Sequence, residues 1–291
     1  MQDKTLIISF SGGRTSAYMT KLLLQERDKW KDVIVLFANT GQEDERTLEF
    51  VHNCDVSFGY NTVWIEADVQ PEKGKGTSFN VVSYDTASRD GKPFEAVIAK
   101  YGIPFTKSPH CTRELKQYPI QAYVRSLGLK KIEYKMAIGI RADEIDRMSP
   151  NAASNSLIYP LVEHNVTKQD VLNWWRGQPF DLDIPEHYGN CLWCWKKSFR
   201  KLFTLLEERP EVFEFPERME RLYGNAGAVA NKLGKEIKFF RGFKSVQDLR
   251  DMALEGYDEF VDQHYLDISN GCSESCEVSF DEVQYSLDLG E

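Results

Sequence analysis

Four short apolar runs rich in β-branched residues alternate with segments of helical periodicity, and this rhythm constrains the fold more than any other feature of the chain. The runs are TLIISF at 5–10, VIVLFA at 33–38, TVWIEA at 62–67 and IEYKMAIGI at 132–140. Between the first two, apolar residues of 18–23 recur on one helical face. Strands that alternate with helices build βαβ units. We therefore expect an α/β fold with a parallel twisted sheet covered by helices on both faces.

The second half of the chain has a helical pattern. The segment TKQDVLNWWRG starts with Thr167 as N-cap and Asp170 at the third helical position, which is close to a capping box. A stripe of apolar residues over 199–206 predicts a further core helix. By contrast, the Gly-, Ser- and Lys-containing stretch 73–90 is expected to be a loop or flap. We expect an α/β domain over 1–165, a helical region over 166–254 and an acidic tail over 255–291.

The charge is unevenly distributed. The 291 residues carry a net charge of −9, but eleven acidic residues and no Lys or Arg lie between Glu255 and Glu291, so residues 1–254 carry a net charge of +2. Acidic tails are most often solvated and partly disordered, and they can also shield a basic site. The slightly basic body therefore remains compatible with an anionic ligand.

The sequence predicts a cytoplasmic protein. The start of the chain lacks the charged-then-apolar pattern of a secretory signal, and no apolar run approaches the roughly 18 residues of a membrane span. Six cysteines are too few for a disulfide scaffold of this size, so metal binding or chemistry is the better interpretation.

The first strand leads into SFSGGRTSAYM at 9–19, where two glycines lie at a strand-to-helix junction. Glycine tolerates positive φ and lets a backbone approach a ligand, while a helix N-terminus favours an anion. The hydroxyls of Ser9, Ser11, Thr15 and Ser16 and the charge of Arg14 would add to such a site. The spacing differs from the Walker and dinucleotide patterns. A tight connection is the plainer alternative, but the surrounding pattern favours a phosphate site.

SGGRTS resembles the PP-loop, SGGxDS, of the ATP pyrophosphatase (adenine nucleotide alpha hydrolase-like) superfamily. Other stretches resemble its branch of phosphoadenosine phosphosulfate reductases and DNA phosphorothioation sulfurtransferases: LFANTGQE, HCTRELKQYPI, GIRADE, YPLVEHNVTKQDVLNWW and HYGNCLWC. The resemblance covers residues 5 to about 200. It implies a HUP-like fold and an enzyme that uses an adenine nucleotide.

The resemblance also implies a set of nucleotide-binding residues. The loop residues and Arg141 would face the phosphates, and the end of the second strand would receive adenine and ribose. The expected residues are Ser9, Phe10, Ser11, Gly12, Gly13, Arg14, Thr15, Ser16, Phe37, Asn39, Gly139 and Arg141. Thr15 replaces the family's Asp, which leaves Glu43 or Asp44 as candidates for holding Mg²⁺.

Cys191 and Cys194 form a C-x-x-C turn, a spacing that aims two thiolates at one metal or cluster. The resemblance brings Cys111 to the same pocket and implies a [4Fe–4S] cluster, with His110 as a candidate fourth ligand. Zinc is the alternative ion, and separate buried thiols are the alternative without metal. Cys272 and Cys276 lack the pattern of a reductase tail.

The resemblance implies a sulfurtransferase that adenylates a substrate with ATP, releases pyrophosphate and transfers sulfur supplied by a donor protein. Lys196, Lys197, Arg200 and Lys201 form a candidate surface for RNA or DNA, although such a row is commonly only a solvated helix face. One alternative is a sulfonucleotide reductase, which takes electrons from a partner. The other is a non-catalytic nucleotide- or nucleic-acid-binding protein.

Overall fold

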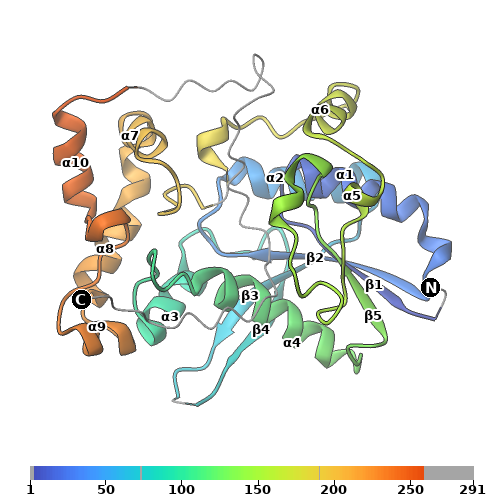
Figure 1. Ribbon diagram of the computed structural model, residues 1–291, viewed down its shortest axis with the longest axis horizontal. Coiled ribbons are helices and arrows are strands. Elements are labelled where there is room, and N and C mark those ends of the chain that lie inside the picture. Colours follow the sequence, from blue (N-terminus) through green and yellow to red (C-terminus); the bar gives the residue numbers. More distant parts are fainter. Residues whose placement is uncertain (1–2, 73, 190, 259–291) are drawn as a thin grey trace.

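The computed structural model describes residues 3–72, 74–189 and 191–258, and its centre is a six-stranded sheet (Figure 1). The strands lie in the order β4-β3-β2-β1-β5-β6. They are β1 (Thr5–Ser9), β2 (Asp32–Asn39), β3 (Val63–Val69), β4 (Thr77–Val82), β5 (Tyr134–Ala137) and β6 (Leu157–Ile158). β3 and β4 pair antiparallel, and the other neighbours pair in parallel. The protein therefore has a mostly parallel, Rossmann-like α/β fold, as the sequence predicts.

Helices cover both faces of this sheet. The N-terminal helices are α1 (Arg14–Gln25), α2 (Glu45–Phe58), α3 (Lys92–Tyr101) and α4 (Tyr118–Ser126). Leu6 and Ile8 of β1 join one buried cluster with residues of α1 and α2, whereas Ile7 joins a second cluster with residues of α4. Successive strand side chains point to opposite faces, so a strand that is apolar throughout needs cover on both.

The rest of the described chain is mainly helical. It contains α5 (Pro160–Glu163), α6 (Lys168–Arg176), α7 (Phe199–Glu208), α8 (Glu214–Tyr223), α9 (Gly227–Leu233) and α10 (Val246–Leu254). Figure 1 shows α7 to α10 gathered on one side of the molecule. α6 begins with the predicted capping box of Thr167 and Asp170, and α7 buries Leu202 and Phe203 as expected.

Short turns connect these elements. They are the 3₁₀ turns η1 (Arg27–Lys29), η3 (Ala142–Arg147), η4 (Glu186–Tyr188), η5 (Pro210–Phe213) and η6 (Arg241–Phe243), and the π-helical turn η2 (Arg113–Gln117), which leads into α4.

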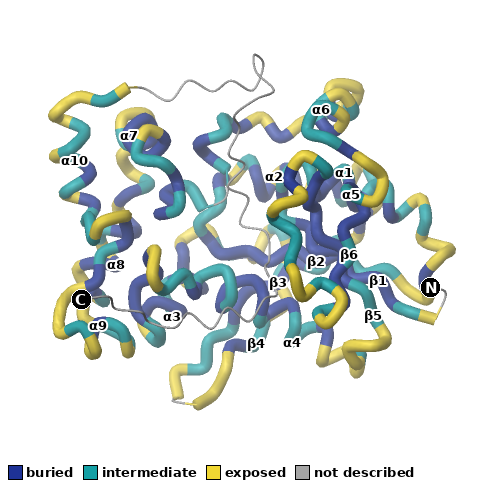
Figure 2. Tube along the Cα trace, in the orientation of Figure 1, coloured by how far each residue is buried: buried dark blue, intermediate teal, exposed yellow. Residues whose placement is uncertain are grey.

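Buried residues continue from the sheet into the helical half (Figure 2). Trp175 of α6 packs on Phe50 of α2 with ring centroids 4.9 Å apart. In the same core, Phe215 of α8 packs on Phe94 of α3 with ring centroids 6.0 Å apart. The same large core therefore holds the C-terminal helices against the α/β body.

Two predicted elements differ from the structure. The expected loop over 73–90 contains β4, which pairs with β3 over Thr77–Val82. Gly, Ser and Asn in and around this edge strand hide it from a periodicity analysis, and long-range contacts stabilise it: pairing with β3 and packing of Phe79 on Tyr123 of α4. The apolar run at 132–140 forms a strand only over Tyr134–Ala137, which is β5. The edge strand β6, at Leu157–Ile158, has no counterpart among the predicted strands.

Within the described ranges, no helix combines the length and apolar character needed to cross a membrane. The predictions about Cys272, Cys276 and the acidic tail beyond residue 258 lie outside the described residues.

Candidate functional site

A cavity of about 210 Å³ lies beside the carboxyl ends of β1 and β5. β2 and β3 follow on one side of β1, while β6 lies beyond β5, so the strand order reverses between these two strands. Open α/β sheets bind ligands in the crevice at such a switch point. The lining comes from the glycine loop 11–15, from Arg141 after β5, and from α6, segment 182–189 and α7.

The two glycines of the loop differ in what the fold demands of them. Gly12 has φ +80°, and a Cβ there would lie 2.9 Å from Thr47 Cγ2 and 3.0 Å from Phe37 Cε2. Gly13 has φ −104°, and the nearest described atom to a Cβ there would be Ser11 Oγ at 3.9 Å. Chain conformation and packing therefore require glycine only at position 12. The missing side chain of Gly13 leaves the backbone accessible from the cavity.

Helix α1 begins immediately after Gly13. In this fully described helix, no side chain caps the N-terminus and the first turn holds no acidic residue. Ser16 Oγ instead accepts from Ser11 N at 3.2 Å and donates to Gly13 O at 3.0 Å, which fixes the loop. Uncapped N–H groups at the positive end of a helix favour an anion.

Arg141 lies against the loop. Its Nη1 donates to Thr15 Oγ1 at 3.1 Å, and its guanidinium pairs with Asp143 and Glu144 at 3.0 and 3.1 Å. Burial would raise the pKa of Asp143, but the hydrogen bond and charge of Arg141 outweigh it and lower that pKa. Arg14 is held by Asp181 at 2.6 Å. Carboxylates outside the lining thus orient both guanidinium groups.

The lining is strongly cationic. Its described charged residues are Arg14, Lys116, Arg141, Lys168, Lys197 and Lys201, against Glu43 and Glu186. Lys201 Nζ pairs with Glu186 at 2.8 Å. A concave surface with this excess of positive charge concentrates polyanions.

The proposed surface row of four basic residues is wrong for two of its members. Lys197 and Lys201 are buried, with 3% and 7% of their surface exposed, and line the cavity. Lys197 Nζ donates to the carbonyls of Cys191 and Leu192, so it also holds the C-x-x-C turn. Helical spacing shows that these lysines avoid the Leu202 face, but it cannot show that another element covers them.

Two further cations of the cavity, Lys116 and Lys168, lie in stretches that carry the resemblance but are not among the expected binding residues. Lys168 is the first residue of α6, where the sequence reveals only a helix start. Lys116 lies in the π-helical turn η2, and π-helical turns occur frequently at functional sites. Only the packing of these elements brings both lysines to the cavity.

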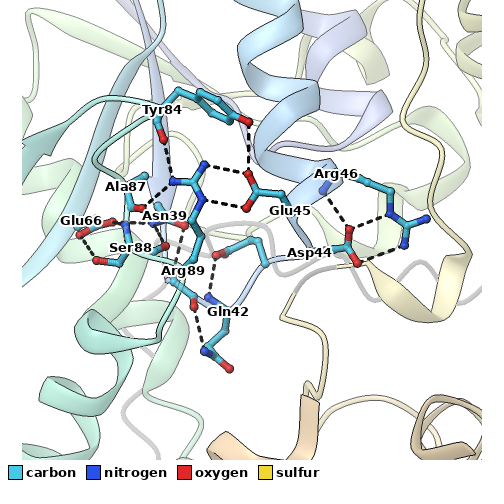
Figure 3. A network of polar contacts seen from close by, with 12 residues as sticks. Asn39, Gln42, Asp44, Glu45, Arg46, Glu66, Tyr84, Ala87, Ser88 and Arg89 are labelled. Carbon is cyan, nitrogen blue, oxygen red and sulfur yellow. Dashed lines mark hydrogen bonds and ion pairs between the residues drawn. The ribbon is translucent and has the colours of Figure 1, made fainter. Parts of the chain in front are cut away.

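Six of the twelve expected nucleotide-binding residues do not line this cavity: Phe37 and Asn39 at the expected adenine site, and Ser9, Phe10, Ser16 and Gly139. Ser9, Phe10, Phe37, Asn39 and Gly139 are buried in and beside the sheet. Asn39 Nδ2 donates to Glu66 Oε1 at 2.6 Å and to Ser88 O at 2.9 Å, within a network that fixes the segment before α3 (Figure 3). These residues belong to the core beneath the site and do not face the cavity.

The two candidate magnesium ligands are already engaged. Glu43 accepts from Thr40 N at 3.0 Å, from Thr40 Oγ1 at 2.9 Å and from Gln42 N at 3.2 Å. Asp44 caps α2 and pairs with Arg46 at 2.9 Å (Figure 3). It also pairs with Arg209 at 2.9 Å. Burial would raise the pKa of Asp44, but the arginines lower it. The residues therefore do not fit a magnesium site.

Cys111, Cys191 and Cys194 line one small apolar cavity of about 20 Å³, roughly the space of a water molecule. Lys116 lines this thiol cavity and the cationic cavity, so the two adjoin. Thiols around one point are ligands typical of zinc and iron–sulfur clusters. As arranged, however, no three His, Cys, Asp or Glu side chains in the described ranges are close enough to share a metal.

His110 does not line the thiol cavity. Its Nε2 contacts Gly102 O at 3.1 Å and its Nδ1 contacts Ser108 Oγ at 3.3 Å. Burial lowers its pKa to about 4. The structure therefore brings together the three cysteines but not the candidate fourth ligand. Cys54 is fully buried in the core, as predicted.

Fold and site together define a Rossmann-like α/β protein with a cation-lined cavity at its switch point. No family model matches the sequence. The chain is 33% identical over 286 residues to the "Uncharacterized nin region protein ORF290" of Escherichia phage lambda, and the match covers 94% of each chain. The protein belongs to the family of that phage protein.

Proposed function

We propose that this protein is a PP-loop enzyme with a HUP-like fold that binds ATP, adenylates an acceptor with release of pyrophosphate, and transfers sulfur to it. One observation carries the proposal: the glycine loop, an uncapped helix N-terminus and six cationic side chains converge on one cavity at the switch point, directly beside three thiols. A polyphosphate fits such a lining, and an adjacent thiol cavity fits sulfur chemistry.

In the first step, an acceptor oxygen attacks the α-phosphorus of ATP and the bond to pyrophosphate breaks. Negative charge accumulates on the leaving pyrophosphate. Gly13 and the first turn of α1 would offer backbone N–H groups to it, and Arg141, beside Thr15, and Lys168 would add positive charge from the same lining. Donors fixed before the reaction stabilise such charge without reorganising.

In the second step, a sulfide equivalent displaces AMP from the adenylated acceptor. Cys111, Cys191 and Cys194 are the residues that would hold a [4Fe–4S] cluster, and the cluster would supply a site at which sulfide binds. Zinc, the alternative, would require the three thiols to move closer together. Lys116, which lines both cavities, would stand between the sulfur and the nucleotide. The acceptor class we propose is a nucleic-acid base or backbone.

The first test is calorimetric titration of the protein with ATP and, separately, with phosphoadenosine phosphosulfate. We expect ATP to bind, and Lys168→Met to weaken binding about tenfold, because a charged hydrogen bond contributes about 1.5–3 kcal/mol. Lys196→Met is the matched control, since Lys196 does not line the cavity.

The outcomes separate the candidate functions. Preference for the sulfonucleotide over ATP would replace this proposal with a sulfonucleotide reductase. Binding of ATP without conversion to AMP and pyrophosphate, in the presence of candidate acceptors, would favour a non-catalytic binding protein. Equal loss of affinity for ATP in the Lys196 and Lys168 variants would show that the cavity is not the ATP-binding site.

A further inference from the structure

We infer that the cationic cavity holds the diphosphate group of its ligand as a metal-free anion, with fixed lysine and arginine side chains in the place that Mg²⁺ takes at other nucleotide sites. The identity of the ligand as a nucleotide rests on the proposed function. The metal-free mode of binding rests on the lining itself.

The first observation concerns the carboxylates that line the cavity. Mg²⁺ is usually held by one or two carboxylates together with substrate phosphates and water. Glu186 is paired with Lys201 at 2.8 Å, and Glu43 accepts three hydrogen bonds from the turn that follows β2. Recruiting either carboxylate to a metal would break contacts that fix the lining. In the parts of the chain that are described, no other carboxylate lines the cavity.

The second observation concerns Thr15. The resembled loop carries Asp at this position, where a carboxylate would face the phosphates. Here Thr15 Oγ1 accepts a hydrogen bond from Arg141 Nη1 at 3.1 Å. At this point of the cavity the guanidinium of Arg141 therefore takes the place of a metal-binding carboxylate.

The third observation is the number and placement of cations. Six line the cavity, and they come from five segments: the loop, η2, the turn after β5, α6, and the segment 197–201 at the start of α7. Asp181, which pairs with Arg14, and Asp143, one of the two acids that pair with Arg141, each have 40% of their side chains exposed, so water screens their charge. Glu144, the second partner of Arg141, is buried and offsets part of the charge of that arginine. Lysine and arginine are established ligands of phosphate groups. The side chains thus supply the positive charge that a diphosphate needs.

The test uses the full-length protein and calorimetric titration with two probes, inorganic pyrophosphate and ATP, each in excess EDTA and in excess Mg²⁺. We expect pyrophosphate to bind in EDTA with an affinity within about threefold of its affinity with Mg²⁺. Binding should weaken steeply with added salt, because it depends on charge. If Mg²⁺ raises the affinity for pyrophosphate about tenfold or more over that in EDTA, the inference is overturned.

Thr15→Asp provides the sharpest variant. A carboxylate at this position pairs with Arg141 and repels the diphosphate, so binding in EDTA should weaken about tenfold. Adding Mg²⁺ should recover most of the loss, because the new carboxylate can share the metal with the phosphates. Thr15→Asn is the control of similar size without charge, and it should retain binding in EDTA.

The two proposals fail in different ways. Pyrophosphate binding in EDTA without ATP binding leaves the metal-free mode intact and removes the proposed function. ATP binding only with Mg²⁺ leaves the proposed function and overturns the inference. Absence of binding by both probes in both buffers overturns both, provided that circular dichroism shows a folded protein.

Discussion

At the scale of single residues, Glu220 is a buried carboxylate at the junction of the C-terminal helices. It has 6% of its surface exposed and accepts from the backbone N–H groups of Phe239 and Val246, both at 3.1 Å. Burial raises its pKa to about 7, although the two hydrogen bonds lower it in part. Glu220 thus joins α8 to the segments before and at the start of α10.

This pKa predicts a pH-dependent stability. Ordinary glutamate has a pKa of 4.5, so the folded state binds the proton more tightly than the unfolded state. Protonated Glu220 makes its full contribution to the free energy of unfolding below about pH 4.5. This contribution, at most about 3 kcal/mol, is lost as the pH rises to about 7. In urea unfolding, Glu220→Gln should be less stable than wild type at low pH, and this difference should shrink as the pH rises.

Glu217→Gln serves as the control, because Glu217 lies on the same helix in a half-exposed pair with Arg250. Its difference from wild type should be small throughout, because a half-exposed ion pair contributes at most about 1 kcal/mol. A wild-type profile that runs parallel to that of Glu220→Gln from pH 4.5 to 7.5 would contradict the assigned pKa shift.

At the scale of elements, the contact between α3 and α8 depends on Gly91, the residue that precedes α3. Gly91 has φ +77°, and a Cβ there would lie 2.6 Å from Gln42 Nε2 and would overlap the ring of Phe215. Gln42 also accepts from Trp193 Nε1. One small residue therefore lets α8, the turn after β2 and the C-x-x-C segment pack together.

Gly91→Ala should destabilise the protein by about 3 kcal/mol, since it combines overpacking with an unfavourable left-handed conformation. Gly59→Ala is the matched control. Gly59 has φ +66° at the end of α2, and no described atom lies within 4 Å of the position that a Cβ would take there. This control should cost only about 1 kcal/mol. Equal shifts of the urea midpoint in the two variants would show that the α3–α8 contact adapts freely.

At the scale of the whole molecule, the thiol cavity depends on segments far apart in the chain. Cys111 precedes η2, whereas Cys191 and Cys194 lie between η4 and α7, and an isolated bridge joins Cys191 to Glu43 after β2. The cavity therefore exists only when the helical half is docked on the sheet.

The cluster proposal predicts a brown protein after anoxic purification. Replacing Cys111, Cys191 or Cys194 by Ala should remove the colour and lower the stability of the C-terminal half, because metal binding is coupled to folding. Cys54→Ala should keep the colour, since Cys54 lies in the core away from this cavity. Visible absorption with iron and sulfide analysis measures the effect. A colourless protein with stoichiometric zinc would contradict the cluster prediction and identify zinc as the bound ion.

Features that depend on neighbours along the chain are the ones that the sequence predicts. Apolar runs specified β1, β2 and β3, Thr167 and Asp170 specified the start of α6, and the glycine pair specified a loop at a strand end. Each of these follows from local periodicity, capping or backbone freedom. The expectations about the nucleotide and the cluster came from the resemblance and remain proposals.

Which side chains share a cavity depends instead on how distant segments pack. β4 needed β3 as its partner, and Lys197 and Lys201 became cavity residues because the glycine loop and segment 182–189 face their side of the chain. Lys116 and Lys168 reached the same cavity from segments about fifty residues apart. Periodicity reports which face of an element is apolar, but not what packs against the polar face. That depends on long-range packing, which is why the charge of this cavity could not be read from the sequence.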